Sequence, residues 1–95
     1  MLKENFQFWL KSKGYSEYTP KGLPSTVYDY PKRIEYIIWY EKLKSWQDIV
    51  INIDRLLEEY SENGIKSEIG KKSHSAVINA LKRFNEFCIE TNQLI

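Results

Sequence analysis

The side chains best suited to binding chemistry in this sequence are cations and small hydrogen-bonding residues near its C-terminal end. Lysine and arginine bind phosphates by charge, whereas serine and asparagine donate hydrogen bonds to phosphates and base edges. Four of them recur at steps of three and four residues, which places them on one side of a predicted helix. They are Lys72, Ser75, Asn79 and Lys82. The pattern indicates a surface for a polyanion; the alternative is a polar face that serves only solubility.

Three basic pairs carry the densest positive charge: Lys32–Arg33, Lys71–Lys72 and Lys82–Arg83. The net charge of +1 is a weak argument for a polyanion partner, but the charge is unevenly distributed. Between residues 48 and 62 there are five acids and one base. Any polyanion-binding face is therefore expected on the other segments.

Nucleophilic catalysis needs a reactive side chain beside a base, and this sequence has one histidine and one cysteine. His74 and Cys88 lie fourteen residues apart on one predicted helix, which keeps them from meeting within one chain. No HExxH, paired CxxC, glycine-rich phosphate loop or GxSxG motif occurs. We therefore expect no catalytic residues, no metal site and no cofactor. His74 is expected to be packed or to cap its helix, with a phosphate contact as the alternative.

The composition is that of one small globular domain, with 42% hydrophobic and 28% charged residues in a chain of 95. A single cysteine excludes an intramolecular disulfide and agrees with a cytoplasmic location. No apolar run predicts a signal peptide or a membrane span. We expect one domain over residues 1–95.

A second helix of the predicted fold is the segment that must position Lys32 and Arg33. We predict it from about Ser25 to Glu41, because an apolar stripe at helical spacing continues through that range. The stripe consists of Val27, Tyr30, Ile34, Ile37 and Ile38. Pro31 falls inside it and costs about 3 kcal/mol in a helix interior, so a bend is expected there.

Three further helices complete the prediction. The first ends near Gly14. The third begins at Ser45 and ends at Asn63–Gly64, and Asp48 is the acidic partner of Ser45 in a predicted capping box. The last begins near Ser73. The apolar stripes of these helices are Leu2, Phe6, Trp9 and Leu10; Ile49, Ile53, Leu56, Leu57 and Tyr60; and Val77, Ala80, Leu81, Phe84, Phe87 and Cys88. The predicted fold class is all-α, a compact four-helix bundle, with Ile65 and Ile69 folded back onto its core.

Three aromatic residues of the second helix, Tyr36, Trp39 and Tyr40, fall off its main stripe. The favoured interpretation is that they cover a second interface between helices. The alternative is an exposed patch for a partner.

The chain resembles the N-terminal core-binding domain of phage integrases and other tyrosine recombinases, a SAM-like four-helix domain. The resemblance rests on FxxWL in the first helix, on the T-V-x-x-Y pattern from Thr26 to Tyr30, and on SHSAVINALKRFNEF from Ser73 to Phe87. It covers most of the chain, from Phe6 to Cys88.

This resemblance implies a domain that clamps one side of double-stranded DNA with its second and fourth helices. The residues to which it points as DNA contacts are Lys32, Arg33, Lys71, Lys72, Ser75, Asn79, Lys82 and Arg83. In that family the catalytic Arg, His and Tyr belong to a separate C-terminal domain. The resemblance therefore implies DNA binding without catalysis by this chain, and a longer parent recombinase that cleaves and rejoins DNA.

A second hypothesis is a SAM-like helical module for protein–protein interaction. The low net charge, the acidic third helix and the three off-stripe aromatic residues favour it. It predicts self-association or a protein partner, whereas the first hypothesis predicts retention on duplex DNA.

Overall fold

The computed structural model describes residues 1–93 and folds them into helices joined by turns. The helices are α1 Leu2–Ser12, α2 Thr26–Tyr40, α3 Trp46–Ile51, α4 Ile53–Tyr60, α5 Ser67–Gly70 and α6 Lys72–Glu90. Over the described range there is no strand, only an isolated bridge between Tyr18 and Pro24. The predicted all-α class is confirmed. Residues 1–93 form six helices rather than four, because the predicted third helix is divided and α5 is added.

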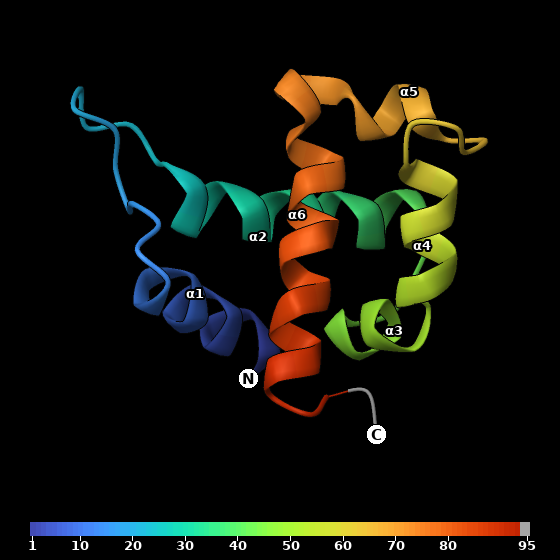
Figure 1. Ribbon diagram of the computed structural model, residues 1–95, viewed down its shortest axis with the longest axis horizontal. Coiled ribbons are helices and arrows are strands. Elements are labelled where there is room, and N and C mark those ends of the chain that lie inside the picture. The colour runs from blue at the N-terminus through green and yellow to red at the C-terminus, as the bar shows by residue number, and fades with distance from the viewer. Residues whose placement is uncertain (94–95) are drawn as a thin grey trace.

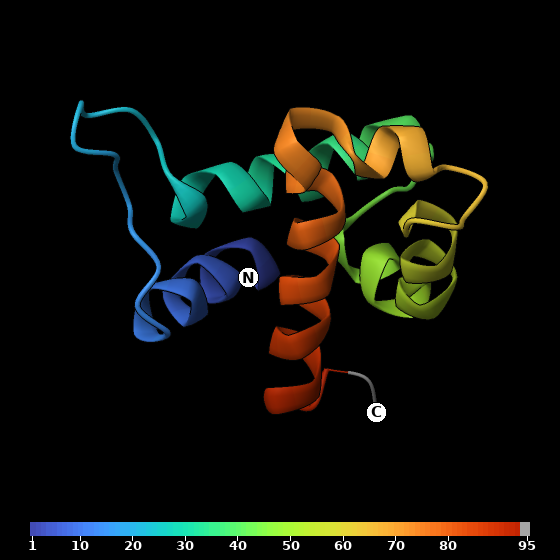
Figure 2. The same cartoon turned by 45° about the horizontal axis from the view of Figure 1, so that its top comes forward.

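Helix α6 stands at the centre of the molecule and crosses α2, with α1 on one side and α3 and α4 on the other (Figures 1 and 2). The core forms where these helices meet. Phe6 of α1 packs edge-on against Phe84 of α6, with ring centroids 5.2 Å apart, and Phe87 lies 5.5 Å from both rings. Trp46 of α3 lies 5.5 Å from Phe84. Burial of this aromatic cluster fixes α6 against α1 and α3, and so fixes which face of α6 is left to solvent.

Helix α2 has the predicted bounds, with Ser25 as its N-cap and Glu41 as its C-cap. Pro31 lies inside it and is buried, and the ribbon continues through this position to Tyr40 (Figure 1). Burial of Val27, Ile34 and Ile37, the apolar stripe on either side of the proline, offsets the missing hydrogen bond. The bend expected at Pro31 stays a prediction.

The predicted third helix is divided at Asn52, whose backbone leaves the helical region at φ −102° and ψ 12°. The Asn52 side chain donates a hydrogen bond of 2.8 Å to the Asp48 carbonyl, which also accepts the Asn52 backbone N–H at 3.1 Å. The predicted capping box is also wrong, because Ser45 makes no side-chain cap. Instead the Asp48 carboxylate accepts a hydrogen bond from the Lys44 backbone N–H at 2.8 Å.

The start of the last helix differs from the prediction as well. Ser73, His74 and Ser75 have φ of 54°, 58° and 66°, which makes one left-handed turn inside α6, and the right-handed helix resumes at Ala76. Each left-handed residue other than glycine costs about 1–2 kcal/mol. The turn reorients the residues before it relative to those after it.

The segment between α4 and α6 is held close to the end of α4. Gly70 is buried, and a Cβ atom there would overlap the Tyr60 carbonyl oxygen. Ile69 packs against the core as predicted, but Ile65 is 85% exposed, so the prediction that it folds back is wrong. The close contact between Gly70 and the end of α4 already brings this segment back to the core, and the Ile65 side chain stays in solvent.

A polar cluster joins the end of α2 to α4. The Glu41 side chain is only 8% exposed and accepts hydrogen bonds at 2.6 Å from both the Tyr60 hydroxyl and Lys66 Nζ. Arg55 Nη1 lies 3.4 Å from the same carboxylate, and Glu59 bridges Arg55 and Lys66 at 2.9 Å. We refer to these five residues as the Glu41 cluster.

Candidate nucleic-acid interface

A hollow of about 220 Å³ between α4 and α6 brings together four of the predicted site residues, Lys71, Ser75, Asn79 and Lys82. Both lysines are exposed and make no ion pair within residues 1–93, while Ser75 and Asn79 are half-buried. The rest of the wall is Tyr60, Ser61, Glu62 and Ile78. We call this the basic hollow. It offers two exposed cations and two hydrogen-bonding groups that can bind a phosphate, beside one carboxylate, Glu62, that opposes an anion.

The left-handed turn determines this grouping. In an unbroken helix Lys72 would share a side with Ser75, Asn79 and Lys82, as the spacing predicted. The turn reorients Lys72 instead toward α2, where its Nζ lies 5.9 Å from the centre of the Tyr36 ring. Lys71, the residue before it, lines the basic hollow. The predicted shared side is therefore wrong for Lys72.

The basic pair on α2 is divided in the same way. Lys32 is exposed and has no acidic partner in the described range. Arg33 is half-buried, and its Nε and Nη2 atoms donate to the Asp29 carboxylate at 3.2 Å each. Arg33 is thus engaged within its own helix, and Lys32 is the member of the pair that is open to a ligand.

Arg83 is engaged as well. Its Nη1 donates to the Tyr15 hydroxyl at 3.4 Å, and its Nη2 lies 3.4 Å from Glu86. The bond to Tyr15, aided by the charge of Glu86, raises the pKa of Arg83 and keeps the guanidinium charged. Arg83 therefore ties α6 to the segment after α1, while Lys82 beside it lines the basic hollow.

His74 is exposed in the middle of the left-handed turn and makes no side-chain cap to α6. The prediction that it is packed or caps the helix is wrong, because the turn points the side chain away from the core. It lies three residues from Lys71 but does not line the basic hollow.

The charged side chains sort into a paired and an unpaired set. Seven lysines of the described chain have no ion-pair partner: Lys21, Lys32, Lys42, Lys44, Lys71, Lys72 and Lys82. Lys32 lies on α2, Lys71 and Lys72 lie at the start of α6, and Lys82 lies within α6. Helices α2 and α6 pack together. Carboxylates outside ion pairs include Asp54, Glu58 and Glu62, in α4 and just after it. The free lysines of α2 and α6 thus lie on other helices than the free carboxylates of α4, but Glu62, just after α4, shares the basic hollow with Lys71 and Lys82.

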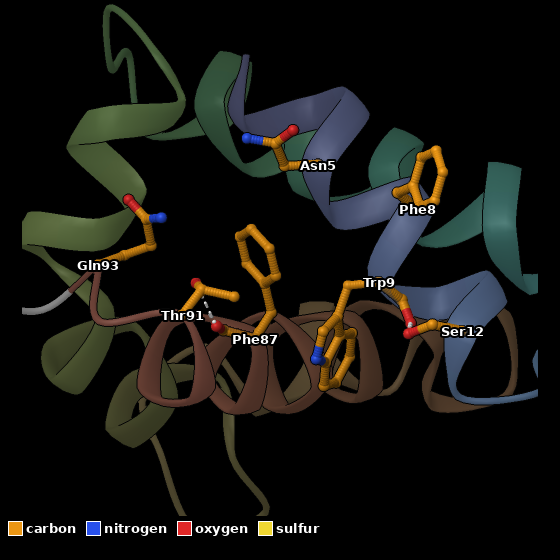
Figure 3. Close-up of a pocket in the computed structure, with 7 residues that line it drawn as sticks. All are labelled: Asn5, Phe8, Trp9, Ser12, Phe87, Thr91 and Gln93. Atoms are coloured by element: carbon orange, nitrogen blue, oxygen red, sulfur yellow. Dashed lines mark hydrogen bonds between the residues drawn. The ribbon is translucent and has the colours of Figure 1, made fainter.

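A second hollow, of about 330 Å³, lies between α1 and the end of α6 (Figure 3). Trp9 and Phe87 project into it. The Ser12 and Thr91 hydroxyls each donate a hydrogen bond of 2.7 Å to a backbone carbonyl. No charged side chain lines it. It lacks the groups that a polyanion requires.

The three off-stripe aromatic residues of α2 form a surface cluster. Trp39 is 73% exposed and Tyr40 is 43% exposed, so the favoured interpretation that they cover a second helix interface is wrong for these two. Tyr36 is half-buried and packs against the core.

Comparison with known proteins finds no match: no family model, no curated protein and no solved structure corresponds to this chain. None of the helices between residues 1 and 93 is long and apolar enough to cross a membrane. In the same range no group of three or more His, Cys, Asp or Glu side chains is arranged to hold a metal ion.

Proposed function

We propose that this chain is a double-stranded DNA-binding domain, of the SAM-like core-binding type found in integrases and other tyrosine recombinases, that binds mainly phosphates through α2 and α6. The observation that carries the proposal is the set of four unpaired lysines on these two packed helices: Lys32, Lys71, Lys72 and Lys82. Catalysis is assigned to a C-terminal domain of a longer parent protein, and the basic hollow is assigned to one backbone phosphate.

The pairing of charges supports these assignments in energetic terms. A cation beside a carboxylate brings little net charge to a phosphate, because the carboxylate repels the same phosphate. An unpaired lysine instead releases a condensed counterion from the DNA, and this release drives binding. In this proposal Arg33 and Arg83 are structural residues rather than DNA contacts, and the four unpaired lysines of α2 and α6 are the contacts.

The number of phosphate contacts determines how strongly the affinity for DNA depends on salt concentration. Four phosphate contacts give a slope of log K against log [salt] of about −3.6. Affinity for a blunt duplex should then fall roughly 100-fold between 50 and 200 mM salt. Fluorescence anisotropy of a labelled duplex of random sequence measures both quantities.

A matched pair of variants tests the placement of the contacts. K32Q/K71Q/K72Q/K82Q removes the four proposed contacts, and K21Q/K42Q/K44Q removes three unpaired lysines that lie elsewhere. We expect the first variant to lose duplex binding at 50 mM salt and the second to keep a salt slope close to that of the parent. Equal losses in the two variants would reject the placement, and no duplex retention by the parent protein at low salt would reject the function.

The second candidate is a SAM-like module for protein–protein interaction, which the 73% exposure of Trp39 favours. It predicts concentration-dependent self-association or capture of a protein partner, without binding to duplex DNA. Sedimentation velocity over a concentration series, performed beside the DNA titration, separates the two candidates.

A further inference from the structure

Three aromatic rings on the C-terminal half of α2 make a continuous surface. Tyr36 and Tyr40, one helical turn apart, have ring centroids separated by 6.0 Å and planes inclined by only 17°. The Trp39 ring lies 5.9 Å from Tyr36. We refer to Tyr36, Trp39 and Tyr40 as the aromatic platform.

The platform is anchored at one end and open at the other. Tyr36 is half-buried and packs against the core, which limits its motion, whereas Trp39 presents 73% of its surface to solvent. An exposed indole on a rigid helix is a flat apolar face of the size of a nucleobase. Such a face gains free energy when a base stacks on it, and Tyr36 beside it is already held by the core.

The charges beside the platform are positive and free. Lys72 approaches the Tyr36 ring from the start of α6, and Lys32 precedes Tyr36 by one turn of α2. The carboxylates of α2 are already neutralised, Asp29 by Arg33 and Glu35 by Lys3. The surface around the rings therefore attracts anions and contains no free carboxylate of α2 that would repel them.

We propose that the aromatic platform stacks the unpaired bases of a single strand, whose phosphates then replace duplex phosphates at Lys32 and Lys72. The combination of exposed π-faces with free cations is complementary to single-stranded nucleic acid, which offers both bases and phosphates to one surface. Paired bases in a blunt duplex keep their faces covered, so the platform has no role in duplex binding. The inference rests on the proposed function in one respect: the single strand is the continuation of a duplex held by the basic hollow.

Three ligands of matched length isolate the contribution of the bases. They are a blunt duplex, the same duplex with a six-nucleotide thymidine overhang, and the same duplex with an overhang of six abasic nucleotides. The two overhangs carry equal charge and differ only in the bases. We expect the thymidine overhang to bind about 5- to 100-fold more tightly than the abasic overhang at the same salt concentration.

The variants are chosen to leave the fold intact. W39A should abolish the difference between the two overhangs without changing blunt-duplex affinity, and W39F should retain most of it. F8A is the matched control, because Phe8 is 77% exposed on α1 and takes no part in the platform. It should behave as the parent protein with all three ligands.

The outcomes separate this inference from the proposed function. Equal affinity for the two overhangs, or a difference that survives in W39A, overturns the platform even when the blunt duplex binds. Binding of a free thymidine 12-mer, but not of an abasic 12-mer or a blunt duplex, supports the platform and rejects duplex binding. Self-association that W39A abolishes, together with equal affinity for the two overhangs, would identify the occupant as a second copy of this chain and overturn the inference.

Discussion

Replacement of Glu41 by Gln tests the energetic reasoning about this fold most directly. The Glu41 carboxylate is nearly buried and accepts two hydrogen bonds of 2.6 Å, from the Tyr60 hydroxyl and from Lys66. Hydrogen bonds to a charged group contribute about 1.5–3 kcal/mol each, and a glutamine oxygen accepts them without the charge. Lys66 retains Glu59 as a second partner at 2.9 Å, which limits the loss. We therefore expect E41Q to lower the free energy of unfolding by about 2 kcal/mol.

The assay is urea unfolding followed by far-ultraviolet circular dichroism, with thermal unfolding beside it. In a domain of this length, a loss of about 2 kcal/mol lowers Tm by about 8–16 °C. E35Q is the matched control on the same helix, since Glu35 is 42% exposed and pairs with Lys3 at 3.2 Å. Because solvent screens that pair, E35Q should cost about 0.5 kcal/mol or less. Equal effects of E41Q and E35Q would refute the claim that burial strengthens the Glu41 cluster.

The same residue predicts a pH dependence. Burial alone would raise the pKa of Glu41, but the hydrogen bonds from Lys66 and Tyr60 outweigh burial and hold this pKa below its ordinary value. A folded pKa below the unfolded pKa contributes stability above the unfolded value, and that contribution is lost as pH falls toward the folded value. The difference in unfolding free energy between the parent protein and E41Q should therefore be constant near neutral pH and shrink below about pH 4.5. A constant difference down to pH 3 would contradict the assigned shift.

Three other measurements test separate features. Burial raises the pKa of Cys88 to about 11. The native protein should therefore resist a thiol reagent at pH 8 and react once urea unfolds it. Rapid reaction of the native protein would contradict this packing. G70A should lower the free energy of unfolding by about 1–3 kcal/mol, because its Cβ overlaps the Tyr60 carbonyl, and an unchanged urea midpoint would show that the backbone yields freely. H74G should raise stability by about 0.5–1 kcal/mol, because glycine adopts a φ of 58° without strain, and a lower Tm would argue against the left-handed turn.

The elements that the sequence predicts correctly are those in which apolar spacing and end signals agree. The bounds of α2 follow from its stripe and from Ser25, and the end of α1 follows from Gly14, which has a φ of 92°. The break at Asn52 was not predictable in this way. The stripe of Ile49, Ile53 and Leu56 keeps helical spacing across it, and the only local signal is Asn52 itself, whose side chain can bond to a nearby backbone carbonyl.

The candidate site was predictable by residue type and only partly by position. Lys32, Lys71 and Lys82 are open to a ligand, as basic surface residues usually are. The ion pairs of Arg33 with Asp29 and of Arg83 with Glu86 follow helical spacing and could have been read from the sequence, whereas the bond from Arg83 to Tyr15 depends on the fold. The left-handed turn contains no glycine, so the usual sequence signal for a positive φ is missing. Its sequence of Ser73, His74 and Ser75 is compatible with an ordinary helix start, so the separation of Lys72 from the basic hollow required the structure.

The Glu41 cluster also has a consequence for how the molecule opens. The bond between Glu41 and Lys66 joins positions 25 apart in the chain, and α3 and α4 lie in the loop that it closes. This bond therefore holds α4 to the end of α2, while α1, α3 and α6 are held together by the aromatic cluster. Protonation of Glu41 would release this bond and leave the aromatic cluster in place. Amide hydrogens of α4 should then exchange at acid pH before those of α2 and α6.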